Sequence, residues 1–154
     1  MYKCEMEKEL TKYSREGKVD KVKRLLRWGV NPNCYVFLNK HTKTTPLWCA
    51  AYKGHGDVAK LLLDAGADPD MANGSGLTPL HVATGMRTND VVLCRILLEA
   101  GADPNKANRD GDTLLRKAHL QNQRDVIQLL LDHGADPRNI QGNTSGWLKP
   151  IGYP

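Results

Sequence analysis

The chain has 154 residues, of which 40% are hydrophobic and 25% are charged, and its formal net charge is +5. This balance is typical of a soluble folded protein and argues against global disorder. The longest apolar runs fall far short of the roughly 18 to 20 residues that a membrane-spanning helix needs, and the first residues lack the apolar core of a signal peptide. We therefore expect an intracellular protein, cytoplasmic or nuclear, that does not enter a membrane.

Four short phrases divide the chain into units of similar length. Each phrase begins with glycine, ends with proline and follows a leucine-rich run, at residues 29–32, 66–69, 101–104 and 134–137. The glycines are 37, 35 and 33 residues apart. A period near 33 residues predicts stacked supersecondary units rather than one closed core, and such stacks present long surfaces to partners.

The first unit, at about residues 7–33, has the character of an N-terminal cap. Lys21 and Arg24 take positions in its second helix that are apolar in later units, so that side is expected to face water. The connection that follows, residues 34–44, is four residues longer than the basic period requires. It contains Phe37, the only phenylalanine of the chain.

The second unit, at about residues 41–70, shows the clearest helix signals. Thr45 can cap free backbone N–H groups, and Pro46 suits the first helical turn. Gly54 ends a short first helix, and Gly66 supplies the left-handed conformation that closes the second. The third unit, at about residues 74–105, repeats this pattern.

The third unit also carries two additional residues between its helices, around Met86, and a tolerated surface insertion is the simplest interpretation. The fourth unit, at about residues 109–138, lacks the proline at its helix start. Its first helix is more polar, which fits a C-terminal cap. Residues 139–154 follow as a tail or a partial hairpin.

These units resemble ankyrin repeats. Residues 78–81 read Thr-Pro-Leu-His, residues 50–55 read Ala-Ala-Tyr-Lys-Gly-His, and residues 61–69 read Leu-Leu-Leu-Asp-Ala-Gly-Ala-Asp-Pro. The resemblance covers residues 8 to 138. It implies an all-α solenoid of four helix-turn-helix units joined by β-hairpin-like loops, with residues 1–138 as one repeat domain. It also implies that His55 and His81 tie neighbouring loops by hydrogen bonds.

No cluster in the sequence predicts catalysis, a cofactor or a metal site. The histidines and the four cysteines lack zinc-binding spacing, and no serine elbow or phosphate-binding glycine loop occurs. Asp68, Asp103 and Asp136 lie about one repeat apart, so they cannot share an ion, and local backbone hydrogen bonds are the better explanation. We therefore expect no enzyme activity.

The candidate binding surface is the concave side, where partners of similar ankyrin proteins usually dock. Aromatic residues flanked by lysines, which are typical anchors of interfaces, gather in the long loop and in the first helix of the second unit. Loop tips of the later units extend the same surface. One alternative stays open, in which Phe37 and Leu38 fold back over the base of the loop. The candidate partner-binding residues are Tyr35, Phe37, Leu38, Lys40, His41, Lys43, Trp48, Tyr52, Lys53, Ser75, Leu77, Met86, Arg109 and Asp112.

The sequence thus predicts a monomeric, non-enzymatic module that binds an acidic or mixed surface of another protein. Residues 1–60 carry a large excess of Lys and Arg, which favours an acidic partner. No small-molecule substrate is expected. Two alternatives remain: an inhibitor of an enzyme such as a protein kinase, by analogy with the four-repeat inhibitors of cyclin-dependent kinases, and a basic nucleic-acid-binding protein.

Overall fold

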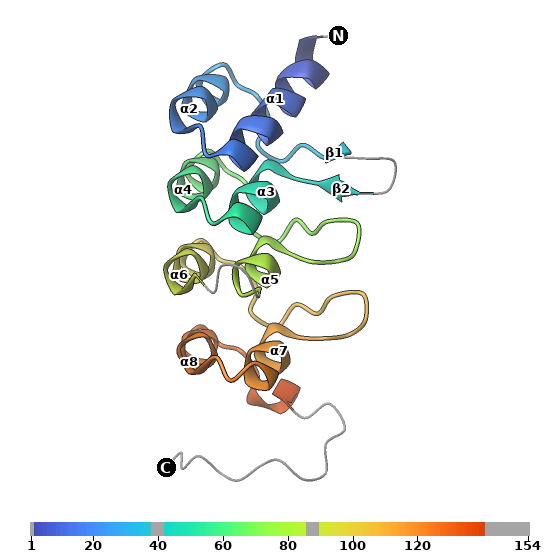
Figure 1. Ribbon diagram of the computed structural model, residues 1–154, viewed down its shortest axis with the longest axis vertical. Helices are drawn as coiled ribbons and strands as arrows, with labels where there is room; N and C mark the ends of the chain where they lie inside the picture. The colour runs from blue at the N-terminus through green and yellow to red at the C-terminus, as the bar shows by residue number, and fades with distance from the viewer. Residues whose placement is uncertain (1, 38–41, 86–89, 141–154) are drawn as a thin grey trace.

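The computed structural model describes residues 2–37, 42–85 and 90–140, and it shows four helix pairs stacked along one axis (Figure 1). The second helices of the pairs form one column and the first helices form another. The prediction of an all-α solenoid is therefore confirmed. The pairs are α1 (Tyr2–Glu16) with α2 (Val19–Arg27), α3 (Pro46–Lys53) with α4 (Gly56–Asp64), α5 (Pro79–Ala83) with α6 (Val91–Glu99), and α7 (Leu114–Leu120) with α8 (Arg124–Asp132).

The connections between repeats project sideways from the column of first helices (Figure 1). In the first connection, β1 (Val36–Phe37) pairs antiparallel with β2 (Lys43–Thr44). The next two connections close at residues 73–77 and 108–112 by backbone hydrogen bonds. Gly74 N–H donates to the Lys43 carbonyl at 3.1 Å, so adjacent connections lie against one another. We call the surface formed by α1, α3, α5, α7 and these connections the inner face.

Threonine caps begin three of the first helices. The hydroxyl of Thr45 accepts from the N–H of Trp48 at 3.1 Å, and Thr78 and Thr113 serve α5 and α7 in the same way. Each cap satisfies a backbone donor that the helix itself leaves unpaired. α3 then ends at Gly54, whose φ of 74° is left-handed, as the sequence predicts.

The core is a row of leucine, valine and alanine side chains that runs through all four repeats. Leu10, Leu47, Leu80 and Leu115 are at most 1% exposed. Cys49 and Cys94, each 1% exposed, are buried as small apolar residues. Burial raises the pKa of the Cys94 thiol to about 12, so this thiol stays protonated.

A ladder of polar side chains links successive repeats at the residue after each Gly-x-x-Pro phrase. The Asn33 side chain donates to the Gly66 carbonyl and accepts from the Asp68 N–H, and Asn105 makes the same pair of bonds to Gly134 and Asp136. Between these two rungs, the Asp70 carboxylate accepts from the Asp103 N–H. We call this set the repeat ladder.

The ladder changes at its last equivalent position. Arg138 stands where the earlier repeats carry Asn33, Asp70 and Asn105, and it turns back to pair with Asp136 at 2.7 Å. Within the described residues the chain then continues as a short 3-10 helix, η1 (Pro137–Ile140), which packs against α7.

Candidate functional site

The hairpin of β1 and β2 presents two aromatic rings of the predicted site. Phe37 is 66% exposed, which within the described residues argues against self-packing of its ring. Tyr35 is anchored, because its hydroxyl donates to the Ala72 carbonyl at 3.3 Å. The ammonium of Lys43 lies 3.5 Å from the Tyr35 ring centroid, in a cation–π contact. The predicted residues Leu38, Lys40 and His41 lie outside the described residues.

A second aromatic pair lies on α3. The rings of Trp48 and Tyr52 stack with centroids 5.1 Å apart and planes 10° from parallel. Tyr52 is 41% exposed, and the Lys53 ammonium lies 5.6 Å from its ring centroid. Trp48 is only 9% exposed and belongs to the buried core. Its ring therefore packs against Tyr52 and offers a partner little surface.

A basic hollow of about 340 Å³ lies between α1 and the hairpin. Lys8, Lys12 and Arg15 follow one another at helical spacing, and Val36 of β1 closes the other side. None of these three cations forms a salt bridge with another described residue. From the sequence, the first unit is expected only to be an N-terminal cap. The spacing of Lys8, Lys12 and Arg15 is the signal that could have identified this hollow.

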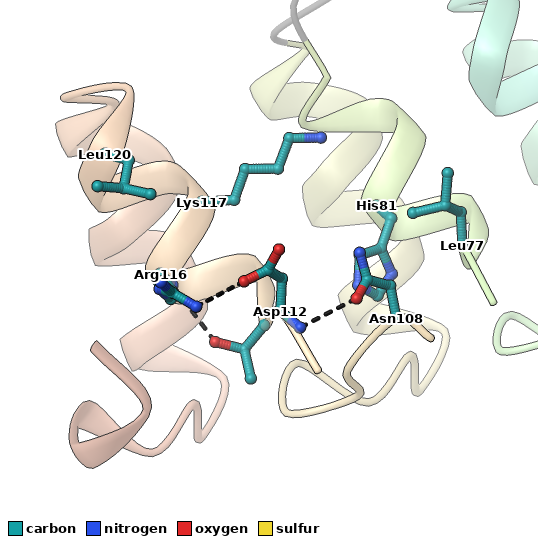
Figure 2. Close-up of a pocket in the computed structure, with 8 residues that line it drawn as sticks. Leu77, His81, Asn108, Asp112, Arg116, Lys117 and Leu120 are labelled. Atoms are coloured by element: carbon teal, nitrogen blue, oxygen red, sulfur yellow. Dashed lines mark hydrogen bonds and ion pairs between the residues drawn. The ribbon is translucent and has the colours of Figure 1, made fainter. Parts of the chain in front are cut away.

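A pocket of about 310 Å³ separates α5 from α7, and we call it the α5–α7 pocket (Figure 2). Two predicted residues, Leu77 and Asp112, line it, while Ser75 and Arg109 are exposed at the adjacent loop tips. The predicted residue Met86 lies outside the described residues. Sequence reasoning missed the other lining residues, which are His81, Asn108, Thr113, Arg116, Lys117 and Leu120.

The third repeat differs from its neighbours at one position near the end of its first helix. Tyr52, Gly85 and Leu120 each follow the capping threonine of their repeat by seven positions, so the third repeat has no side chain there. Leu120 is 74% exposed. An alignment of the repeats against one another would have revealed this difference.

His81 forms the buried part of the pocket, and its tautomer is set by its hydrogen bonds. The Thr78 N–H points at Nδ1 at 3.2 Å, and the Thr78 hydroxyl lies 2.7 Å from the same atom. Nδ1 is therefore an acceptor, and Nε2 carries the proton. Nε2 is buried, and no described acceptor meets strict hydrogen-bond geometry with it. The Asp112 backbone still interacts with the ring and partly offsets the effect of burial on its pKa.

The charges around the pocket are unequal. Burial lowers the pKa of His81 to about 4, and the charges of Lys117 and Lys106 act in the same direction, so its imidazole is neutral at pH 7. Arg116 pairs with Asp112 at 2.7 Å. Lys117 forms no salt bridge with the described residues. The α5–α7 pocket therefore has one unpaired positive charge.

The remaining polar residues that the sequence singled out have structural partners. Asp68, Asp103 and Asp136 each accept the backbone N–H two residues further on, which confirms the local role predicted for them. His55 lies 3.2 Å from the Arg15 carbonyl and so links α1 to the second repeat. Among the described residues, no group of three acidic, His or Cys side chains could hold a metal ion. Their helices also include none with the length and apolar character that crossing a membrane requires.

Stacked helix pairs, capping threonines and projecting loops define an ankyrin-type solenoid. A family model described as ankyrin repeats, in three copies, matches residues 10–108 and, in an overlapping register, residues 65–141. The chain belongs to the ankyrin repeat family. Ankyrin repeats generally mediate protein–protein interaction and are typically not enzymes.

The similar curated proteins are much larger than this chain. It is 39% identical to the potassium channel KOR2 of Oryza sativa subsp. japonica over 71 residues, which are 46% of this chain and 9% of the channel. It is 34% identical over 88 residues to the human oxysterol-binding protein-related protein 1, covering 57% and 9% of the two chains. For the mouse inactive serine/threonine-protein kinase TEX14 the identity is 34% over 78 residues, covering 51% and 5%. The chain thus spans less than a tenth of the length of these relatives.

Proposed function

We propose that this chain is a non-enzymatic interaction module that binds an acidic or mixed surface of a partner protein along the N-terminal part of its inner face. The observation that carries the proposal is the group of exposed aromatic rings at the hairpin and on α3. Phe37 is 66% exposed, and Tyr35 and Tyr52 each have a lysine ammonium beside the ring.

Rigid aromatic side chains gain large contact area at low entropic cost, and interface energy tends to concentrate on a few of them. Here the rings are already held in place. Tyr35 is fixed by its hydrogen bond to Ala72, and Tyr52 by the stack on Trp48. A partner therefore spends little free energy on ordering these two anchors.

The charges nearby favour an acidic partner. Lys8, Lys12 and Arg15 of the basic hollow form no salt bridges with other described residues. They outnumber Glu16, the acidic residue that also lines the hollow. An excess of exposed positive charge accelerates association with an acidic surface and makes that association depend on salt.

The test compares the double variant Phe37→Ala/Tyr52→Ala with the single variant Trp28→Ala. Trp28 is 63% exposed, has Arg24 beside its ring and lies at the end of α2 in the opposite column, so it is a matched control. Proteins retained by each immobilised variant are quantified by mass spectrometry. We expect the affinity for the specific partner to fall about 30-fold for each anchor removed, since a true anchor contributes about 2 kcal/mol, and to be unaffected by Trp28→Ala.

Equal retention by the wild type and a folded double variant would show that the aromatic group is not the binding surface. Nuclease treatment of the lysate tests the alternative that the chain binds nucleic acid. If all specific retention disappears with the nuclease, the basic hollow serves nucleic acid instead of a protein.

A further inference from the structure

The α5–α7 pocket combines apolar walls with one free positive charge. Leu77 and Leu120 lie at its two sides, and Figure 2 shows Lys117 extending from α7 in the direction of α5. The positions that correspond to Lys117 in the second and third repeats hold Cys49 and Val82, counted from the capping threonine. A lysine at this position is therefore not required for stacking the repeats.

The hydrogen-bonding groups of the pocket are mostly satisfied by one another. Arg116 is held by Asp112, and Asn108 accepts from the Asp112 N–H at 2.9 Å. The ammonium of Lys117 forms no salt bridge with a described residue. It needs an oxygen acceptor, and one that carries negative charge suits it best.

We propose that the α5–α7 pocket binds one glutamate side chain of an extended segment of the partner protein, with the carboxylate paired to Lys117 and the methylene groups between Leu77 and Leu120. This inference rests on the proposed function, because it names a subsite on the same inner face. It adds a specificity determinant about two repeats from the aromatic group.

The charge balance distinguishes a carboxylate from a phosphate. A phosphate group carries about two negative charges at pH 7 and binds best to several free cations. The pocket offers one, because Arg116 is already neutralised, and the Asp112 carboxylate beside it opposes a second negative charge. A carboxylate matches the single charge of Lys117. The volume of about 310 Å³ is at the lower limit of small-molecule sites and sufficient for one side chain.

The test uses two capped pentapeptides, Gly-Gly-Glu-Gly-Gly and the same peptide with glutamine in the centre, titrated into the full 15N-labelled chain. NMR follows the backbone amides of Arg116 and Lys117 and the imidazole of His81. The Lys117→Met variant removes the charge and keeps an unbranched side chain of nearly the same length. Lys60→Met, at an exposed position of α4, is the control.

We expect saturable shifts at the pocket with the glutamate peptide. The glutamine peptide and the Lys117→Met variant should each bind about tenfold more weakly, which corresponds to about 1.4 kcal/mol, and Lys60→Met should bind normally. Equal binding of the two peptides, no effect of Lys117→Met, or no shift at about 20 mM peptide overturns the proposal.

Two further titrations test whether the pocket instead binds a small dicarboxylate or a phosphate. Free glutarate that binds more tightly than the peptide would indicate a small dicarboxylate ligand, and inorganic phosphate that binds more tightly would indicate a phosphate site. Either result overturns the proposal. Phe37 and Tyr52 take no part in these titrations, so failure here leaves the retention experiment on those residues informative.

Discussion

His81 combines a helix-cap interaction and a buried ring in one side chain. Its Nδ1 accepts from Thr78, and this bond requires the neutral imidazole. Protonation therefore removes the cap interaction and places a charge among apolar neighbours and two lysines.

We predict a loss of stability in acid that depends on this residue. The pKa of His81 lies at about 4 in the folded chain against 6.5 for the free side chain, so the unfolded state takes up a proton first as the pH falls. The share of the free energy of unfolding that comes from neutral His81 is fully present above pH 6.5. It is lost progressively as the pH falls to 4, and its full size is about 3 kcal/mol.

Urea denaturation at a series of pH values measures this effect in the wild type and in His81→Gln. The variant should lose this part of the pH dependence, although it is less stable at pH 7. An identical slope between pH 6.5 and 4 in both proteins would refute the assignment.

The first helices differ in how they end. Gly17 and Gly54 are left-handed after α1 and α3, with φ of 70° and 74°. After α7 the same role falls to Asn122, whose φ is 54° and which is the only non-glycine residue with positive φ in the described chain. Asparagine tolerates this conformation better than most residues, but a Cβ atom is still unfavourable there.

Asn122→Gly should therefore raise the free energy of unfolding by about 0.5–1 kcal/mol, and Asn122→Ala should lower it by about 1 kcal/mol. Denaturant titrations of the three proteins give both values. Arg95→Ala, at an exposed position of α6, serves as the control that shows the effect of an ordinary surface change. A destabilising Asn122→Gly would mean that the side chain itself stabilises the helix end.

At the scale of the whole molecule, the repeat ladder supplements the stacked core. Asp70 forms the middle rung by accepting from the Asp103 N–H at 3.0 Å. Solenoid stability is approximately a sum of repeat and interface contributions, so loss of one rung weakens one interface and leaves the others intact.

Asp70→Ala should cost about 0.5–1.5 kcal/mol and should accelerate amide exchange in the third and fourth repeats more than in the first two. Hydrogen exchange followed by NMR resolves this pattern. Asp110→Ala, at an exposed loop tip, is the matched control and should change neither quantity. Uniform acceleration across all four repeats would show that the chain unfolds as a single unit.

The sequence predicts those features that depend on local rules. Thr45, Pro46 and Gly66 specify helix ends through local chemistry, by a side-chain cap or a backbone preference, so the helix pairs could be located without a structure. The burial of Trp48 could not, because it depends on the neighbouring repeats. The α5–α7 pocket depends on how α5 and α7 are placed relative to one another, and the basic hollow depends on how α1 lies beside the hairpin.

The stack of Trp48 on Tyr52 has an optical consequence. An indole that is 9% exposed emits from an apolar environment, whereas Trp28, which is 63% exposed, emits from water. The ring of Tyr52, which is 41% exposed, stacks directly on Trp48. Displacement of that phenol changes the surroundings of the indole directly. The protein thus carries a built-in fluorophore beneath its proposed anchor, and binding at α3 can be followed without an attached label.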